Sequence, residues 1–218
     1  MHGLFLGDEP RRWERLGFAL DASPRAVEAG ASPGAVAAAS PAGVTVGGLR
    51  LALLGTGGGV GGWVLGGDSG PSEVDGIPTR WGPTPWDRAE PAHPNGAQSV
   101  DHVVVFTDDV DRTVEALQAV DGDLRRRAAP PQVPVAMAFV RLGGIIVEVA
   151  QAPDGGPTRI WGLVVTVSDL DALAARLGDD LGEPRPAVQP GRRIATVRPS
   201  AGLETALAFM TPRPPRAG

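Results

Sequence analysis

Apolar and polar residues follow two different periods in the stretch from residue 100 to residue 149. The run 100–107 (VDHVVVFT) is rich in β-branched residues, which predicts a buried strand. Asp109 follows and begins a predicted helix to Val120, with apolar residues at helical spacing. Two further apolar runs, 135–142 and 145–149, flank a Gly-Gly pair and predict a hairpin. The stretch therefore predicts a strand, a helix and a further pair of strands.

The same order of elements recurs, which predicts a chain built from repeats of one supersecondary unit. A later copy has a strand at 161–167, a leucine-lined helix, and strands at 192–198 and 205–210. A weaker copy begins the chain with a short strand at 2–6 and a helix capped by Asp8. The predicted organisation, in chain order, is an eroded unit over residues 1–67, a Pro/Gly/Trp-rich connecting strap over 68–98, two complete units over 99–151 and 158–212, and a tail over 213–218.

A glycine-rich run from Gly57 to Gly62 matches the spacing of a dinucleotide-binding loop. That chemistry needs a helix directly after the loop, because the helix N-terminus carries the pyrophosphate. Here the strand-like residues 63–65 follow instead. The run therefore predicts a hairpin loop, not a nucleotide site.

Composition excludes several classes of chemistry. The chain of 218 residues has no cysteine, tyrosine or lysine, so disulfides, thiolate sites, a tyrosine acid and Schiff bases are ruled out. Its net charge is -5, and the cluster Arg125-Arg126-Arg127 is too short to indicate nucleic-acid binding; we interpret it as a solvated turn. His93, in the strap, is predicted to be exposed. No apolar run is long enough to span a bilayer and no signal peptide is visible, so we expect a cytoplasmic protein with no membrane partner.

The order strand, helix and then strands ending in an acidic residue, Glu148, resembles the βαβββ module of the vicinal oxygen chelate superfamily. That superfamily includes glyoxalase I, extradiol dioxygenases, and fosfomycin- and bleomycin-resistance proteins. Val100 to Gln151 and Thr158 to Thr211 resemble two consecutive modules, and residues 1–67 resemble an eroded third. The resemblance implies an α+β fold, in which repeated βαβββ modules form a curved mixed-sheet bowl with helices on the convex face.

The resemblance also implies a divalent metal (Fe, Mn, Zn or Ni) at the bottom of the bowl. His102 stands at the first-strand ligand position of the family, and Glu148 at the last-strand position. The later unit departs from the pattern, because Gly162 takes the place of a second histidine and Ala206 that of a second carboxylate. Two of the four expected ligands are missing, so the predicted metal site of His102 and Glu148 is incomplete.

Glu148 lies in an apolar strand, so its carboxylate is expected to be partly buried and to need a partner. A metal, His102 and Arg141 on the adjacent strand are the alternatives. His102 and Glu148 are also the candidate catalytic groups, as an acid and a base. The candidate ligand-binding residues are Arg141, Trp161, Phe106 and Arg198, since arginines can hold a carboxylate or phosphate and aromatic rings can wall an apolar pocket.

Two functions of different class fit these features. The first is a glyoxalase-like or dioxygenase-like lyase, isomerase or oxidoreductase acting on a small oxygenated substrate. The second is a metal-free protein that binds an antibiotic or metabolite without catalysis. An odd number of units leaves one without a partner, so either the first unit caps the other two or two chains pair their first units in a homodimer.

Overall fold

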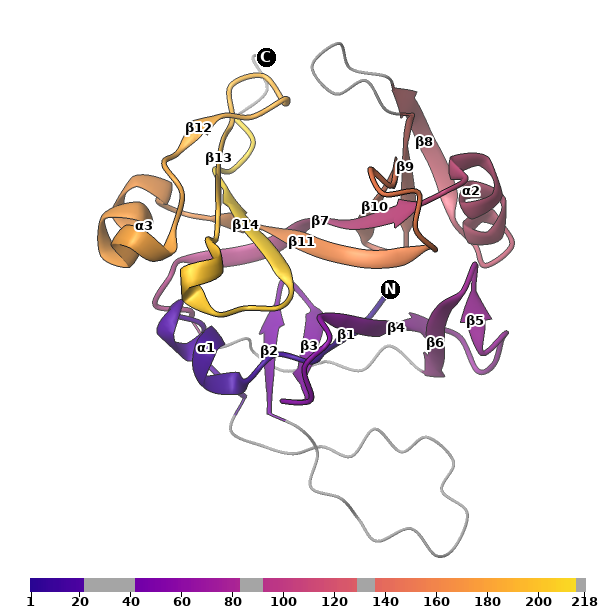
Figure 1. Ribbon diagram of the computed structural model, residues 1–218, viewed down its shortest axis with the longest axis horizontal. Coiled ribbons are helices and arrows are strands. Elements are labelled where there is room, and N and C mark those ends of the chain that lie inside the picture. Colours follow the sequence, from indigo (N-terminus) through magenta and orange to yellow (C-terminus); the bar gives the residue numbers. More distant parts are fainter. Residues whose placement is uncertain (22–41, 83–91, 129–135, 215–218) are drawn as a thin grey trace, which may run out of the picture.

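The computed structural model describes residues 1–21, 42–82, 92–128 and 136–214. Two mixed sheets make up the molecule, one of six strands and one of eight (Figure 1). No helix in these ranges is long and apolar enough to cross a membrane.

The eight-stranded sheet contains both complete units. The first unit comprises β7 (Ala97–Thr107), α2 (Val110–Gln118), β8 (Asp123–Ala128), β9 (Met137–Leu142) and β10 (Ile145–Gln151). The second comprises β11 (Arg159–Val167), α3 (Leu170–Leu177), β12 (Arg185–Pro186), β13 (Arg193–Thr196) and β14 (Ala206–Met210), with 3-10 turns at Gly178–Asp180 and Pro199–Ala201. The strand order is β12-β13-β14-β11-β7-β10-β9-β8. Each unit pairs its first strand in parallel with its last, and β7 pairs with β11 antiparallel at the centre.

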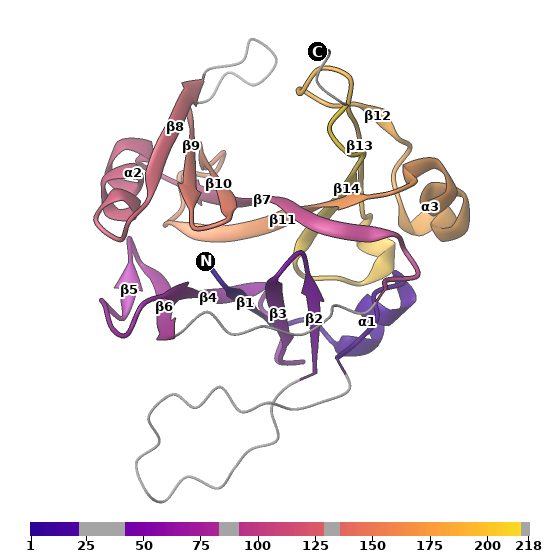
Figure 2. The same cartoon turned by 180° about the vertical axis from the view of Figure 1, so that it is seen from behind.

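The predicted fold class is confirmed, because two βαβββ modules share one strongly curved sheet. The outer strands of both modules rise from the floor formed by β7 and β11, and α2 and α3 lie on the outer side (Figures 1 and 2). Both helices begin at an aspartate, Asp109 or Asp169, whose side chain accepts hydrogen bonds from backbone N–H groups of the first turn. The predicted Gly143-Gly144 turn joins β9 to β10.

The N-terminal sheet contains β1 (Gly3–Leu6), β2 (Gly43–Val46), β3 (Leu49–Leu53), β4 (Val60–Gly66), β5 (Glu73–Val74) and β6 (Ile77–Gly82), with α1 at Pro10–Arg15. Its order is β2-β3-β1-β4-β6-β5. At its centre β1 and β4 are antiparallel, and each pairs in parallel with a later strand, β3 or β6. The eight-stranded sheet has the same arrangement, with β7 and β11 antiparallel at the centre, β7 parallel to β10 and β11 parallel to β14. We therefore interpret the N-terminal sheet as two shortened modules that pair with each other.

The structure thus differs from the expected single N-terminal unit followed by a strap. Strands β5 and β6 lie within the segment 68–98 and extend the first sheet. In β6 the buried residues Ile77 and Thr79 alternate with the exposed Pro78 and Arg80, as in a half-buried strand. The density of Pro and Gly around these short strands concealed the alternation.

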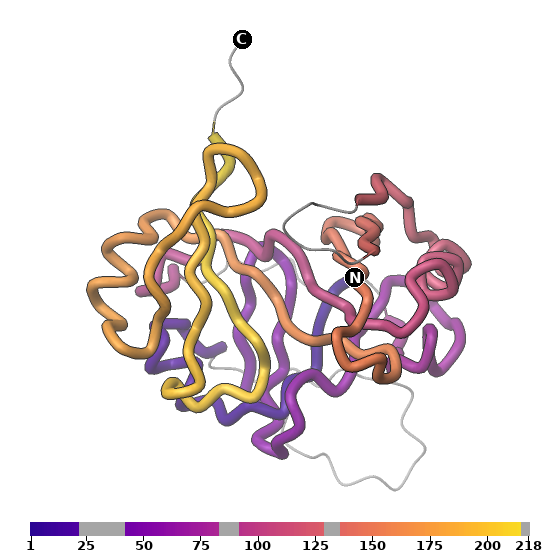
Figure 3. Tube along the Cα trace, turned by 45° about the horizontal axis from the view of Figure 1, so that its top comes forward, coloured from indigo at the N-terminus to yellow at the C-terminus, as the bar shows by residue number. Residues whose placement is uncertain are grey.

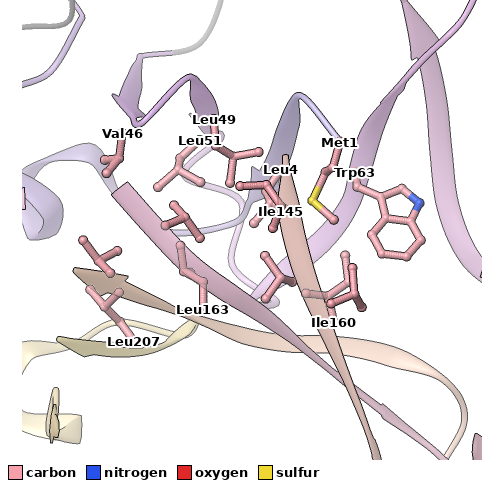
Figure 4. Packing of buried hydrophobic residues seen from close by; sticks show 14 of the residues in the cluster. Met1, Leu4, Val46, Leu49, Leu51, Trp63, Ile145, Ile160, Leu163 and Leu207 are labelled. Carbon is pink, nitrogen blue, oxygen red and sulfur yellow. The ribbon is translucent and has the colours of Figure 1, made fainter. Parts of the chain in front are cut away.

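The hydrophobic core lies between the two sheets. Leu4, Leu51 and Trp63 from the N-terminal sheet face Ile160 and Leu163 on β11, and all belong to one buried cluster (Figure 4). The N-terminal sheet therefore caps the outer face of the floor within one chain, which is the first of the two alternatives for the unpaired unit. The inner face of the floor lies between the outer strands of the two modules (Figure 1), and Figure 3 shows β14, β11 and β7 next to one another in the order of the sheet.

Two aspartates, the buried Asp8 and the partly buried Asp75, join the sheets at their edges. Asp8 accepts a hydrogen bond from the backbone N–H of Glu204 at 2.6 Å, and Trp13 Nε1 donates to its other oxygen at 3.4 Å. Asp75, in the β5–β6 turn, accepts from Arg112 Nε at 2.7 Å and from the Thr158 hydroxyl at 2.8 Å. These bonds fix the position of the N-terminal sheet under the floor.

His93 is buried, contrary to the sequence expectation. The backbone N–H of Ala19 donates to its Nδ1 at 3.1 Å, and its Nε2 donates to the Thr45 carbonyl at 2.8 Å. Both ring nitrogens thus join the segment that follows α1 to strand β2, which gives His93 a structural role.

Candidate functional site

A cleft of about 470 Å³ opens on the inner face of the eight-stranded sheet. Its floor is formed by β7 and β10, and one wall by β8 and β9. The β12–β13 turn and the end of the described chain form the other wall. The lining residues are Asp101, His102, Arg125, Arg126, Phe139, Ile146, Gln189, Pro190, Arg192, Arg213 and Pro214.

A β-bulge in β7 places two polar residues side by side in this cleft. Val100 pairs with Val165 and His102 with Val164, so Asp101 has no partner on β11. Strict alternation would put Asp101 on the face opposite His102, but a bulge redirects the side chain. The Asp101 carboxylate consequently lies beside the His102 ring, with 2.9 Å between Oδ2 and Nδ1.

His102 lies between two carboxylates. His102 Nδ1 donates a hydrogen bond to Asp101 Oδ2, and Glu148 Oε2 lies 3.6 Å from His102 Nε2. The first distance is that of a hydrogen bond and the second is too long for one. With the Nδ1 proton held by Asp101, neutral His102 has its basic lone pair on Nε2. His102 is therefore oriented as a proton acceptor next to a second carboxyl group.

Arg192 anchors Asp101 from the other side. Its Nη1 lies 2.6 Å from Asp101 Oδ1, and its Nε donates to the Thr211 carbonyl at 2.8 Å. The side chains are 2% exposed for Arg192 and 7% for Asp101, so this ion pair is almost fully removed from water. A buried pair with its remaining donors satisfied is rigid, and it fixes the position of the carboxylate that orients His102.

The two carboxyl groups flanking His102 have pKa values shifted in opposite directions. Burial raises the pKa of Glu148, and the nearby charges of His102 and Arg126 only partly offset this. Burial also acts to raise the pKa of Asp101, but hydrogen bonds and charge from His102 and Arg192 outweigh it and hold that pKa well below its usual value. Asp101 thus stays ionised, whereas Glu148 takes up a proton more easily than an exposed glutamate does.

The donor set does not fit the metal centre that the resemblance implies. Only His102 Nε2 and the Glu148 carboxylate converge, and Asp101 is occupied by His102 Nδ1 and Arg192. Within the described residues no three His, Asp or Glu side chains are placed to hold an ion. Firm binding of a first-row metal usually takes three or four protein ligands. We therefore derive no chemistry through a metal.

The opposite module has no donors at the matching positions. Gly162 pairs with Ala206, as His102 pairs with Ile146, and Val164 pairs with Ala208, as Val104 pairs with Glu148. This register makes Ala208, two residues beyond the predicted Ala206, the counterpart of Glu148. Counting residues along the chain from the turn gave a position two residues too early, because the loop before β14 is longer than the two-residue turn before β10.

Close packing at Gly162 also prevents any side chain there. A Cβ built on this glycine would lie 2.1 Å from the carbonyl oxygen and 2.7 Å from the Cβ of Ala206. A second histidine ligand at this position would force β14 away from β11. The strand spacing is therefore adapted to the absence of that ligand.

The predicted ligand-binding residues lie in three different places. Phe106 and Trp161 are in contact, with ring centroids 5.0 Å apart, and Trp161 is 46% exposed at a second bulge of the floor. Arg141 lies 3.1 Å from Asp123 on β8 and is absent from the cleft lining. Arg198 donates to the Asp179 carbonyl at 3.4 Å, beside the 3-10 turns. Only the aromatic pair lies on the floor strands β7 and β11, and neither ring is among the residues that line the cleft.

Sequence reasoning missed Asp101 and three of the four cleft arginines, Arg125, Arg126 and Arg213. The triplet Arg125-Arg126-Arg127, interpreted as a solvated turn, forms the middle of β8 instead. Arg125 and Arg126 line the cleft, whereas Arg127 forms an ion pair with Asp111 on α2. The dipeptide Asp101-His102 was the available signal for the site, but the bulge that unites the two side chains has no mark in the sequence.

Comparisons with known proteins show partial structural similarity. No family model matches the chain, and no curated protein matches it by sequence. A methylmalonyl-CoA epimerase from Mycobacterium tuberculosis is 20% identical with a TM-score of 0.48, over 55% of this chain and 91% of that one. A hypothetical protein from Bacillus halodurans C-125 is 14% identical with a TM-score of 0.47, over 55% and 98%. A Streptomyces coelicolor methylmalonyl-CoA epimerase in complex with 2-nitronate-propionyl-CoA is 19% identical with a TM-score of 0.43, over 53% and 94%.

These similarities are too weak to transfer a reaction or a ligand to this chain. The fold rests instead on the strand order and pairing described above, in which two βαβββ modules join through antiparallel first strands. The eight-stranded half of the chain has the paired βαβββ arrangement that the resemblance implies.

Proposed function

We propose that this protein is a metal-independent enzyme that moves a proton on a small oxygenated molecule bound in the cleft. The observation that carries the proposal is the position of His102, with Asp101 at 2.9 Å from Nδ1 and Glu148 at 3.6 Å from Nε2. An imidazole oriented by a fixed carboxylate is a common form of general base. The reaction class is that of a lyase or isomerase.

Each group has a separate role in this scheme. His102 Nε2 accepts a proton from a carbon next to the substrate carbonyl, and Asp101 stabilises the imidazolium that forms. Glu148, whose pKa is raised by burial, supplies or receives a proton at the neighbouring atom. The proton returns to the substrate at the same or an adjacent carbon, so the step needs no oxidant. Phe106 and Trp161, whose rings are tilted by 35° to each other, provide apolar contacts on the same floor for the rest of the substrate.

The alternative from the sequence, a binder without catalysis, uses the same cleft. The buried Asp101–Arg192 pair favours this alternative, because such a pair can serve solely to join β7 to the turn before β13. A cytoplasmic location and a homodimer stay predictions of the sequence.

Deuterium exchange separates the two functions. The protein is incubated in D2O with a panel of small aldehydes, ketones and acyl esters, and exchange of carbon-bound hydrogen is followed by proton NMR. We expect at least one compound to exchange faster with the protein, and this rate to fall at least about 100-fold in His102→Gln, the usual scale for a general base. Compounds that bind in the cleft without exchange would support the binder and contradict the enzyme.

The matched control is His93→Gln. His93 is buried and hydrogen-bonded at both ring nitrogens like a typical structural histidine, but it lies in the N-terminal sheet region. A loss of exchange in both variants would indicate unfolding; a loss confined to the His102 variant would support the proposal.

A further inference from the structure

The arginines of the cleft indicate which substrates it takes. Four of the eleven lining residues are arginines and one is an aspartate, in a protein whose net charge is -5. Positive charge concentrated in a concave, partly desolvated surface raises the local concentration of anions. The formal charge of the residues that line the cleft is therefore positive, whereas the net charge of the whole chain is negative.

Most arginines of the paired modules already have an acidic partner. Arg112, Arg125, Arg127, Arg141, Arg159, Arg192 and Arg193 each form an ion pair with an aspartate. Arg126 has none among the described residues. Its guanidinium lies instead over the Phe139 ring, 4.8 Å from the centroid. Its positive charge also acts to lower the pKa of Glu148.

The Phe139 ring holds the Arg126 guanidinium in place, and no described residue accepts a hydrogen bond from it. Stacking on an aromatic face restricts a guanidinium while leaving its N–H groups at the edge available. Those donors lie in the cleft that also contains His102. Arg213, on the opposite wall, also lines the cleft and forms no ion pair with a described residue. Two guanidinium groups that form no ion pair with a described residue thus line one cavity from opposite walls.

The geometry points to a small organic anion as the substrate, with its carboxylate or phosphate group held by Arg126 and Arg213 while its carbonyl-activated carbon lies at His102. A planar guanidinium binds either anion through paired hydrogen bonds. This inference rests on the proposed function for the reacting carbon, but the anion site is defined by the arginines alone. Asp101 and Arg192 satisfy each other, so neither takes part in holding the ligand anion.

Binding measurements with charged and neutral pairs of probes test this inference. The carboxylate pair is pyruvate and pyruvamide, and the phosphate pair is dihydroxyacetone phosphate and dihydroxyacetone. Dissociation constants are taken from chemical-shift titrations of the full chain at low ionic strength. We expect at least one anion to bind about tenfold or more tightly than its neutral analogue. The probe pair with this difference shows whether the cleft prefers a carboxylate or a phosphate group. Added salt weakens the binding of that anion.

Variants locate the anion. In Arg126→Gln and in Arg213→Gln the preferred anion is expected to bind about tenfold more weakly, while the neutral analogue is unaffected. Arg127→Gln is the control, because Arg127 neighbours Arg126 on β8 but pairs with Asp111 on α2. Equal binding of the charged and neutral probes, or an Arg126 variant that binds like the wild type, would overturn the inference.

The same titrations distinguish failure of this inference from failure of the proposed function. His102→Gln should keep the preference for the anion while losing proton exchange. An anion that binds through Arg126 without any exchange would contradict the proposed enzyme but support the anion site. Exchange of neutral compounds as fast as of anions would contradict the anion site alone.

Discussion

Asp101 and His102 are neighbours in sequence, and they are hydrogen-bonded through Oδ2 and Nδ1 at 2.9 Å although they lie on a strand. Consecutive residues of a regular strand point to opposite faces, so this contact depends on the β-bulge of β7. The other oxygen of the same carboxylate binds the buried Arg192. One aspartate therefore links the orientation of the histidine to the stability of the sheet.

Asp101→Asn is expected to lower the free energy of unfolding by about 3 kcal/mol, because Arg192 would be left as a buried charge without a counter-ion. The pKa of Asp101 is lowered by folding, so its stabilisation is full above the unfolded value of 3.8 and is lost as pH falls through the folded value. Urea denaturation at pH 7 and at pH 3 should thus show a smaller difference between variant and wild type in acid.

Asp123→Asn is the control for that experiment. Asp123 also pairs with arginines, Arg125 and Arg141, but about half of its side chain is exposed. Exposed pairs contribute less than about 1 kcal/mol. Equal losses in the two variants would mean that burial of the Asp101–Arg192 pair has no energetic consequence.

Glu148→Gln is expected to stabilise the protein at pH 7, by on the order of 1 kcal/mol, since it removes a largely buried charge. Folding raises the pKa of Glu148 through burial, so its contribution is favourable below the unfolded value of 4.5 and is lost as pH rises through the folded value. The difference between variant and wild type should therefore shrink toward pH 4. A variant that is less stable at pH 7 would mean that ionised Glu148 is well paired in the folded protein.

Gly162→Ala is expected to destabilise the protein by about 1–3 kcal/mol, because the new Cβ would overlap the backbone of Ala206. Thermal unfolding measures the effect. Gly144→Ala is the matched control in the β9–β10 turn, where a Cβ would meet no atom within 4 Å. A Gly162 variant with the midpoint of the control would show that β11 and β14 separate easily, and the argument against a second ligand would fail.

Asp75→Ala is expected to loosen the N-terminal sheet from the paired modules. Its carboxylate accepts from Arg112, Thr113 and Thr158, and these contacts join the β5–β6 turn to the other sheet. Hydrogen exchange followed by mass spectrometry should show faster exchange in 73–82 and unchanged protection in β7. Unchanged protection of both segments would mean that the apolar core alone holds the sheets together.

Hydrophobic periodicity predicted the elements of the two complete modules because their buried faces are large. The helix predicted over 109–120 is α2, and the Gly-Gly hairpin is present. Strand β8 was missed because its residues are mostly exposed and charged, so alternation carries no apolar signal there. Strands β5 and β6 were missed for a related reason, since over the segment 68–82 Pro and Gly outnumber the buried residues Val74, Ile77 and Thr79.

The site could be predicted only in part. His102 and Glu148 were found from the resemblance, and the structure places Nε2 and Oε2 within 3.6 Å of each other. Asp101 and Arg192 depend on a bulge and on a contact between residues 91 positions apart, which local pattern does not encode. The unpaired state of Arg126 likewise becomes visible only when the partners of the other arginines are known.

The position of the proton on the His102 ring decides whether His102 can act as the general base. The chain has three histidines, so nitrogen-15 NMR of the labelled protein, compared with His102→Gln, assigns the His102 ring. The account predicts that neutral His102 carries its proton on Nδ1, bonded to Asp101, and an unprotonated Nε2 toward the cleft. A neutral ring with its proton on Nε2 would leave His102 with no basic nitrogen toward Glu148 and the cleft, and would contradict its role as the general base.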